Sequence, residues 1–75
     1  MTDKRKRWIG QVSKLDDFGG PITTRFYDGR IANRLTWAIM NPTNWLVYGC
    51  GMVGQGHAQL YQKDPADGVF YKIGG

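Results

Sequence analysis

Apolar and polar residues alternate in two segments of the first half of the chain, residues 22–27 and 35–40. The residues that would share one face are Ile22, Thr24 and Phe26 in the first segment and Leu35, Trp37 and Ile39 in the second. Alternation with a period of two is typical of a β-strand. We expect the two segments to pair as an antiparallel hairpin, with a turn at Asp28-Gly29-Arg30 and a longer loop before Leu35.

The same pattern predicts three further strands. Residues 7–13 form a first strand, and residues 57–63 and 69–73 form a second hairpin around Asp64-Pro65-Ala66-Asp67-Gly68, a cluster of turn-forming residues. Residues 15–20 contain an Asp-Asp and a Gly-Gly pair, which are typical of a turn.

A single short helix is predicted over residues 42–48. Asn41 is a good N-cap, and its side-chain oxygen is placed to accept a hydrogen bond from the Asn44 N–H. Pro42 suits the first helical position, because no N–H is needed there. Gly49 is placed to end the helix in a left-handed conformation.

These elements predict an α+β fold that is mostly β, with two β-hairpins and one short helix. We expect residues 1–7 to form a basic, flexible tail and residues 8–75 to form one small domain. A core of this size contributes only a few kcal/mol of stability, and the single cysteine cannot form an internal disulfide.

The compartment expected from the sequence is the cytoplasm. A lone thiol fits a reducing environment, and no apolar run approaches the length of a membrane span. The basic run Lys4-Arg5-Lys6-Arg7 leads into Trp8-Ile9-Gly10 rather than into the apolar stretch of a signal peptide. We therefore expect no membrane association.

Glycines and aromatic residues recur in a characteristic order along most of the chain. The motifs are W-x-G (Trp8 to Gly10), D-x-x-G-x-P-I (Asp16 to Ile22), F-x-D-G (Phe26 to Gly29), W-A-x-M (Trp37 to Met40) and Y-G-x-G-x-x-G-x-G (Tyr48 to Gly56). With these motifs the chain resembles small phage-encoded proteins that hold zinc with four cysteines. The resemblance implies a treble-clef fold, in which a cysteine-bearing loop precedes a hairpin and two further cysteines begin a helix. It also implies a phage or prophage origin.

All four positions that match cysteine ligands hold another residue: Leu15, Phe18, Asn41 and Asn44. A closed zinc site needs four donors, and the chain offers only Cys50 and His57, so we expect neither a metal nor another cofactor. Leu15 and Phe18 are expected to fill the emptied volume by packing against Trp37 or Trp45. The Asn41 cap would replace a metal ligand.

The chain contains few of the residue types that serve as nucleophiles, bases or acids in catalysis. The chain has one serine, one histidine, one cysteine and no glutamate, so a catalytic triad would have to combine Cys50, His57 and an aspartate. The run Gly49-Cys50-Gly51-Met52-Val53-Gly54 matches G-x-G-x-x-G, but it follows a predicted helix and precedes a predicted strand, the reverse of a dinucleotide-binding motif. We therefore expect a protein that is not an enzyme.

The formal net charge of +4 is concentrated at one end of the chain. Residues 1–14 carry five basic residues and one aspartate, whereas residues 15–75 carry five of each sign. A basic end of this kind neutralises phosphates, enters an anionic crevice on a protein, or simply increases solubility.

Two non-enzymatic functions follow from these features. In the first, a phage accessory protein binds a host or phage protein, for example to inhibit a host function or a defence system. The candidate contacts are Lys4, Arg5, Lys6, Arg7, Trp8, Arg30, Arg34 and Tyr61, because Arg, Trp and Tyr dominate interface hot spots.

The alternative is a small nucleic-acid-binding protein. Residues 4–7 and Lys14 would contact phosphate, and Trp8, Tyr27 or Tyr61 would stack on bases. Protein binding is favoured because the charge beyond Lys14 sums to zero. The sequence leaves self-association open.

Overall fold

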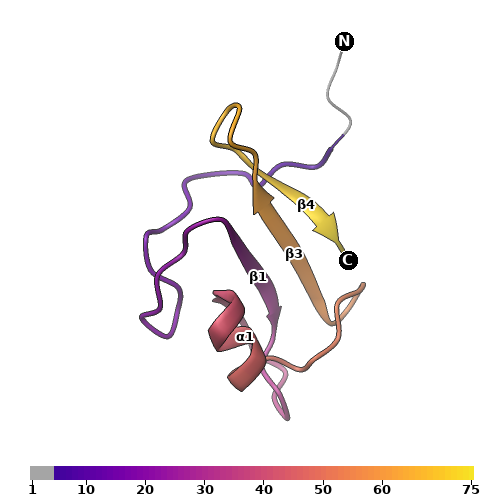
Figure 1. Cartoon of the computed structure of the whole chain (residues 1–75). Helices are drawn as coiled ribbons and strands as arrows, with labels where there is room; N and C mark the ends of the chain where they lie inside the picture. Colours follow the sequence, from indigo (N-terminus) through magenta and orange to yellow (C-terminus); the bar gives the residue numbers. More distant parts are fainter. Residues whose placement is uncertain (1–4) are drawn as a thin grey trace.

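A computed structural model describes residues 5–75 as one antiparallel sheet with a short helix on one face (Figure 1). The elements are β1 (Arg25–Arg30), β2 (Trp37–Met40), α1 (Pro42–Tyr48), β3 (Ala58–Lys63) and β4 (Phe70–Gly74). The strand order is β2-β1-β3-β4. The predicted α+β, mostly β fold class is confirmed.

The first predicted hairpin is present, but its turn lies elsewhere. β1 and β2 pair antiparallel, with Tyr27 opposite Met40. The predicted turn Asp28-Gly29-Arg30 is wrong, since these residues complete β1 and residues 31–36 form the connection. The glycine at position 29 serves packing instead, because a Cβ there would lie 2.6 Å from the Ala58 Cβ.

The sheet is apolar on both faces, which the alternating pattern did not predict. One cluster contains Ala38, Met40, Trp45 and Ala58 beneath α1, and the other contains Phe26, Tyr61 and Phe70. In β2 the buried residues are Ala38 and Met40, whereas Trp37 is exposed. Leu35 lies in the connection before β2 and is 87% exposed, so it does not share a strand face with Trp37 and Ile39 as predicted. Ile39 packs against the second cluster, so both faces of β2 contribute to packing.

The predicted strand over residues 7–13 is wrong. Only Arg7 forms a bridge, to Tyr71, and Gly10 then turns the chain with a φ of 97°. The Trp8 N–H donates to the Phe70 carbonyl at 2.9 Å, which fixes the segment against β4. The Trp8 ring packs edge-on against the second cluster and covers part of that face.

The predicted basic tail needs a different boundary. The Lys72 N–H donates to the Lys6 carbonyl at 2.7 Å, and the Arg5 guanidinium lies 3.1 Å from the Asp64 carboxylate. Residues 5–7 are therefore part of the folded unit, alongside β4 (Figure 1). Residues 1–4 lie outside the described part of the chain.

The helix has the predicted bounds and the predicted start. The Asn44 N–H donates to the Asn41 side-chain oxygen at 2.8 Å. The predicted left-handed end is wrong, because Gly49 has a φ of −72°. Glycine is needed there for space: a Cβ at position 49 would lie 2.1 Å from Cε3 of the Trp45 ring.

The second predicted hairpin is confirmed, with β3 and β4 joined by a turn at residues 64–69. The Asp64 N–H donates to the Val69 carbonyl and the Gly68 N–H to the Asp64 carbonyl. The glycine-rich run 49–54 lies between α1 and β3, as the sequence indicated. Within residues 5–75 no helix is long and apolar enough to cross a membrane.

Candidate functional site

A buried carboxylate joins the loop at residues 15–20 to the start of α1. Asp16 Oδ1 accepts hydrogen bonds from the N–H groups of Phe18 at 2.9 Å and Gly20 at 2.7 Å. Asp16 Oδ2 accepts from the Asn41 N–H at 2.7 Å and from Asn44 Nδ2 at 2.8 Å. The two segments predicted to carry the degenerate ligand positions are thus adjacent, and a carboxylate connects them.

The pKa of Asp16 reflects this environment. Burial acts to raise it, but the hydrogen bonds from Asn41, Asn44, Gly20 and Phe18 outweigh burial and lower the pKa below its ordinary value. The carboxylate is therefore ionised at neutral pH. Because its two oxygens are fully engaged in local hydrogen bonds, its role is structural.

Leu15 and Phe18 do not occupy the expected volume. Leu15 is 54% exposed, and Phe18 is 40% exposed and stacks on Tyr48 with ring centroids 4.4 Å apart. The expectation that they pack against Trp37 or Trp45 is wrong, because Asp16 takes the inward position of the loop.

The described residues 5–75 contain no group of three or more His, Cys, Asp or Glu side chains that could hold a metal ion. Cys50 Sγ lies 3.6 Å from the Met52 carbonyl oxygen and 3.7 Å from the His57 carbonyl oxygen. The His57 ring is engaged elsewhere, with Nδ1 3.3 Å from Arg30 Nη2. The Cys50 thiol and the His57 ring therefore have different contact partners.

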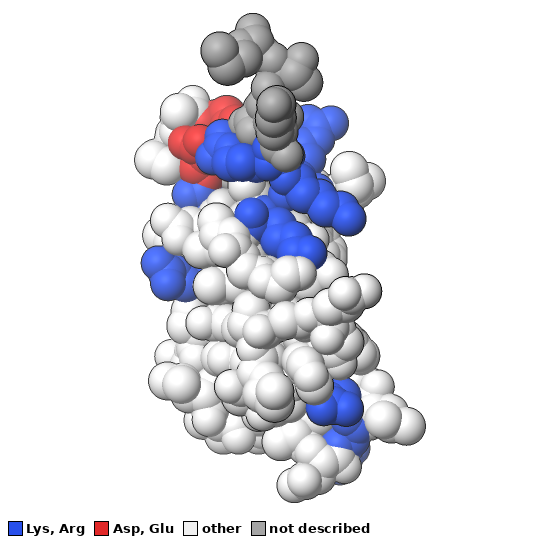
Figure 2. Space-filling view, turned by 90° about the vertical axis from the view of Figure 1, so that its right-hand side faces the viewer, with Lys and Arg blue, Asp and Glu red and all other residues white. Residues whose placement is uncertain are grey.

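The candidate basic residues do not form one surface. Arg5, Lys6 and Arg7 lie alongside β4 and the 64–69 turn, whereas Arg34 lies in the 31–36 loop at the opposite end of the sheet (Figure 1). On the face drawn in Figure 2, lysine and arginine side chains appear in several separate groups, with the largest near the top. Lys4 lies outside the described residues.

The aromatic candidates are less accessible than expected. Tyr61 is only 5% exposed, and its pKa is raised by burial and by the charge of Asp28. Tyr27 stacks on Trp45 with centroids 4.6 Å apart, and Trp8 is half-buried against Phe26 and Tyr61. The prediction of exposed contacts is therefore wrong for Tyr61, and Trp8 offers only part of its ring.

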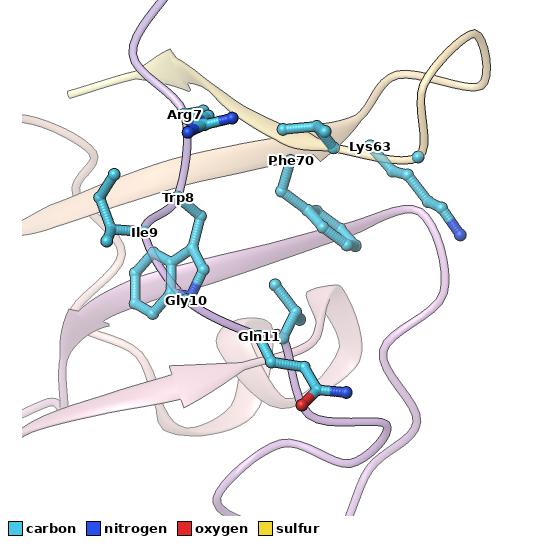
Figure 3. A pocket seen from close by; sticks show the side chains of 10 residues that line it. Arg7, Trp8, Ile9, Gly10, Gln11, Lys63 and Phe70 are labelled. Carbon is cyan, nitrogen blue, oxygen red and sulfur yellow. The ribbon is translucent and has the colours of Figure 1, made fainter.

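Two hollows remain as candidate binding surfaces. The larger, which we call the N-terminal groove, measures about 550 Å³ and is lined by residues 7–12, Lys63 and residues 68–70 (Figure 3). It lies between the N-terminal segment and the β3–β4 hairpin and carries the basic side chains of Arg7 and Lys63.

The second hollow, about 390 Å³, lies beside the end of α1. We call it the Arg34 patch; its lining residues are Phe18, Ile31, Ala32, Arg34, Val47 and Tyr48. Sequence reasoning identified Arg34 but missed the apolar members. The signal was present: residues 45–48 are four consecutive apolar residues on a two-turn helix, which cannot all face the sheet, and only Trp45 is buried.

No family model matches the chain, and neither the curated proteins nor the solved structures contain a match to it.

Proposed function

We propose that this protein is a small, non-enzymatic binding protein that recognises another protein through the Arg34 patch. The observation that carries the proposal is the stacked pair of Phe18 and Tyr48, which stays exposed beside Val47 and Arg34. Tyrosine and arginine are enriched in interface hot spots, and an exposed apolar patch rimmed by polar residues marks an interaction site.

The helix supports this assignment. Val47 is 65% exposed, and Leu46 and Leu35 are also exposed. A chain of 75 residues has few apolar side chains with which to build a core. Side chains left in water contribute no burial free energy unless a partner covers them.

The charge around the Arg34 patch indicates the charge expected on the partner surface. Arg34 lines the Arg34 patch. Together with Arg30, Asn33 and Leu35 it also lines a separate, neighbouring hollow. The residues lining both hollows include no aspartate or glutamate. The partner surface is therefore apolar with carboxylates at its rim, which is complementary to this patch. The resemblance to phage-encoded proteins supports a host or phage protein in the bacterial cytoplasm as that partner.

Nucleic-acid binding is less well supported. Base stacking needs an exposed ring face, and Tyr27 and Tyr61 are committed to packing within the domain. The candidate basic residues Arg5, Lys6 and Arg7 also lie at the other end of the sheet from Arg34 (Figure 1), so these residues do not form one continuous path for a phosphate backbone.

Val47→Asp tests the proposal, with Ile73→Asp as the matched control. Both side chains are exposed and aliphatic, at 65% and 54%, but Ile73 lies on β4, away from the patch. Full-length wild type and both variants are used to capture proteins from bacterial lysate, and any captured protein is then purified and titrated.

A partner that binds wild type and Ile73→Asp alike, but binds Val47→Asp at least about 30-fold more weakly, supports the proposal. Equal binding of a purified partner to all three would overturn it. Gel-shift titration with single- and double-stranded DNA or RNA completes the test: tight binding at physiological salt that is unaffected by Val47→Asp would replace protein recognition with nucleic-acid binding.

A further inference from the structure

We propose that the N-terminal groove is a second binding site, which takes a short, extended, acidic segment of a partner polypeptide. This inference is independent of the Arg34 patch, because the two surfaces lie at opposite ends of the sheet (Figure 1).

The charge of the groove is positive and unneutralised. Arg7 and Lys63 both line it, from the N-terminal segment and from the end of β3 (Figure 3). Within residues 5–75 neither side chain forms an ion pair, and the lining residues include no carboxylate.

The aspartates of the neighbouring turn do not supply the missing charge. Asp64 Oδ2 pairs with Arg5 at 3.1 Å, and its Oδ1 accepts from the Ala66 N–H at 2.9 Å. Asp67 Oδ1 accepts from the Val69 N–H at 2.9 Å, and its Oδ2 from the Tyr71 hydroxyl at 2.6 Å. Asp64 is held by Arg5 and by its own turn, and Asp67 by its own turn and by Tyr71 on β4. Within residues 5–75 neither carboxylate pairs with Arg7 or Lys63, so a ligand carboxylate is the complement of these two residues.

One stretch of backbone along the groove has no hydrogen-bond partner within residues 5–75. Among the described residues, the peptide groups of residues 9–13 form no hydrogen bond, although 9–12 line the groove directly after Trp8 is fixed to Phe70. Because Gly10 turns the chain, this stretch is not a continuous strand edge; an extended peptide in the groove instead brings both N–H and C=O groups to exposed peptide groups that have no hydrogen-bond partner in the described part of the domain. A ligand that offers only anionic groups accepts hydrogen bonds from the N–H groups but brings no donor for the C=O groups.

The floor of the groove favours apolar side chains in the bound peptide. Val12, Val69 and Phe70 are among the lining residues and supply apolar surface to the groove. Successive side chains of an extended peptide point to opposite sides, so a peptide that alternates acidic and apolar residues satisfies the floor and the rim at once. Phe70 is 9% exposed and Trp8 is half-buried against Phe26 and Tyr61, so the two aromatic residues of the groove offer only part of one ring for stacking on a base.

The probe is a capped peptide of about ten residues in which glutamate and valine alternate. It is titrated into full-length, isotope-labelled protein, and the amide resonances are followed by NMR. We expect chemical-shift changes at residues 9–13, Lys63 and Val69. The same peptide with lysine in place of glutamate should cause none of them.

Lys63→Glu and Arg34→Glu make a matched pair, because both residues are exposed and both substitutions change the net charge by the same amount. Of the two residues only Lys63 lines the groove. Lys63→Glu should weaken peptide binding by about tenfold or more, and Arg34→Glu by no more than about twofold. Equal losses in both variants would show non-specific attraction and overturn the site. So would the absence of amide shifts at millimolar peptide, shifts confined to another surface, or tighter binding of a single-stranded oligonucleotide in the same groove.

Discussion

The Asp16 carboxylate accepts the Asn41 backbone N–H at 2.7 Å, so one side chain holds the 15–20 loop against the start of α1. The resemblance predicted from the sequence would place a metal ion between the same loop and the start of the same helix. Here the connection consists of hydrogen bonds to a buried anion, and its strength depends on the geometry and charge of that one carboxylate.

Replacement of Asp16 should be among the most destabilising single changes. Asp16→Ala leaves the N–H groups of Phe18, Gly20 and Asn41 without their acceptor, and we expect a loss of about 3 kcal/mol in the free energy of unfolding. Denaturant unfolding measures it. Asp17→Ala is the control, because Asp17 Oδ2 accepts a single exposed hydrogen bond, from the Ile39 N–H. This substitution should cost about 1 kcal/mol. Similar losses in the two variants would contradict the role given to Asp16.

Acid should weaken the same connection. The pKa of Asp16 is lower in the folded than in the unfolded chain, so its contribution is complete above the ordinary value of 3.8 and is lost as pH falls through the folded-state pKa. The stability difference between wild type and Asp16→Asn should therefore be largest near neutral pH and shrink below about pH 4. A difference independent of pH would show that the charge is unimportant.

Asp28 should behave in the opposite way. Burial, and secondly the charge of Asp17, raise the pKa of Asp28, so its ionised form opposes folding. The folded state is favoured by Asp28 below pH 3.8, and this preference is lost as pH rises through the raised pKa. Asp28→Asn should therefore stabilise the protein at pH 7 and have little effect at pH 3. Carboxyl NMR titration in Asp17→Asn should show a lower Asp28 pKa than in wild type.

The environment of Asn41 changes the substitution expected to preserve its cap. Asn41→Ala should cost about 1–2 kcal/mol. From helix capping alone aspartate would be a good replacement, but Asn41 Nδ2 donates to the Pro21 carbonyl at 3.1 Å, and the Asp16 carboxylate lies at its own backbone N–H. Asn41→Asp would remove that donor and add a second negative charge, so we expect it to be no more stable than Asn41→Ala. Thermal unfolding of both, with Asn41→Ser as the capping control, decides the point.

Gly49→Ala should destabilise the domain although the φ of Gly49 is accessible to alanine. The added Cβ would lie 2.1 Å from Cε3 of Trp45, and relief requires moving the helix end or a buried ring. We expect a loss of about 2–3 kcal/mol, measured by thermal unfolding. Gly74→Ala is the matched control: its Cβ would meet the Val53 Cγ1 at 3.1 Å, and Val53 is an exposed side chain that can move.

The sequence alone determined the elements whose causes lie within a few residues. Asn41 and Pro42 fix the start of α1 because a cap and its N–H partner are three residues apart. The turn at Asp64 to Gly68 likewise brings β3 and β4 together by local hydrogen bonds. The mostly β class and the two hairpins follow from these local signals and from alternation.

Tertiary structure decided what depends on residues far apart in the chain. A period-two pattern assigns one buried face to a strand, but here α1 covers one face of the sheet and the segment around Trp8 covers the other, so Tyr61 is buried. Leu35 is exposed because it lies in the connection between β1 and β2. The inward position of Asp16, the packing glycines at 29 and 49, and the exposed Phe18–Tyr48 pair likewise arise where separate segments meet. No local propensity reports which of several neighbouring side chains will face such a junction, because burial is settled by the partner surface and not by the residue's own neighbours in sequence.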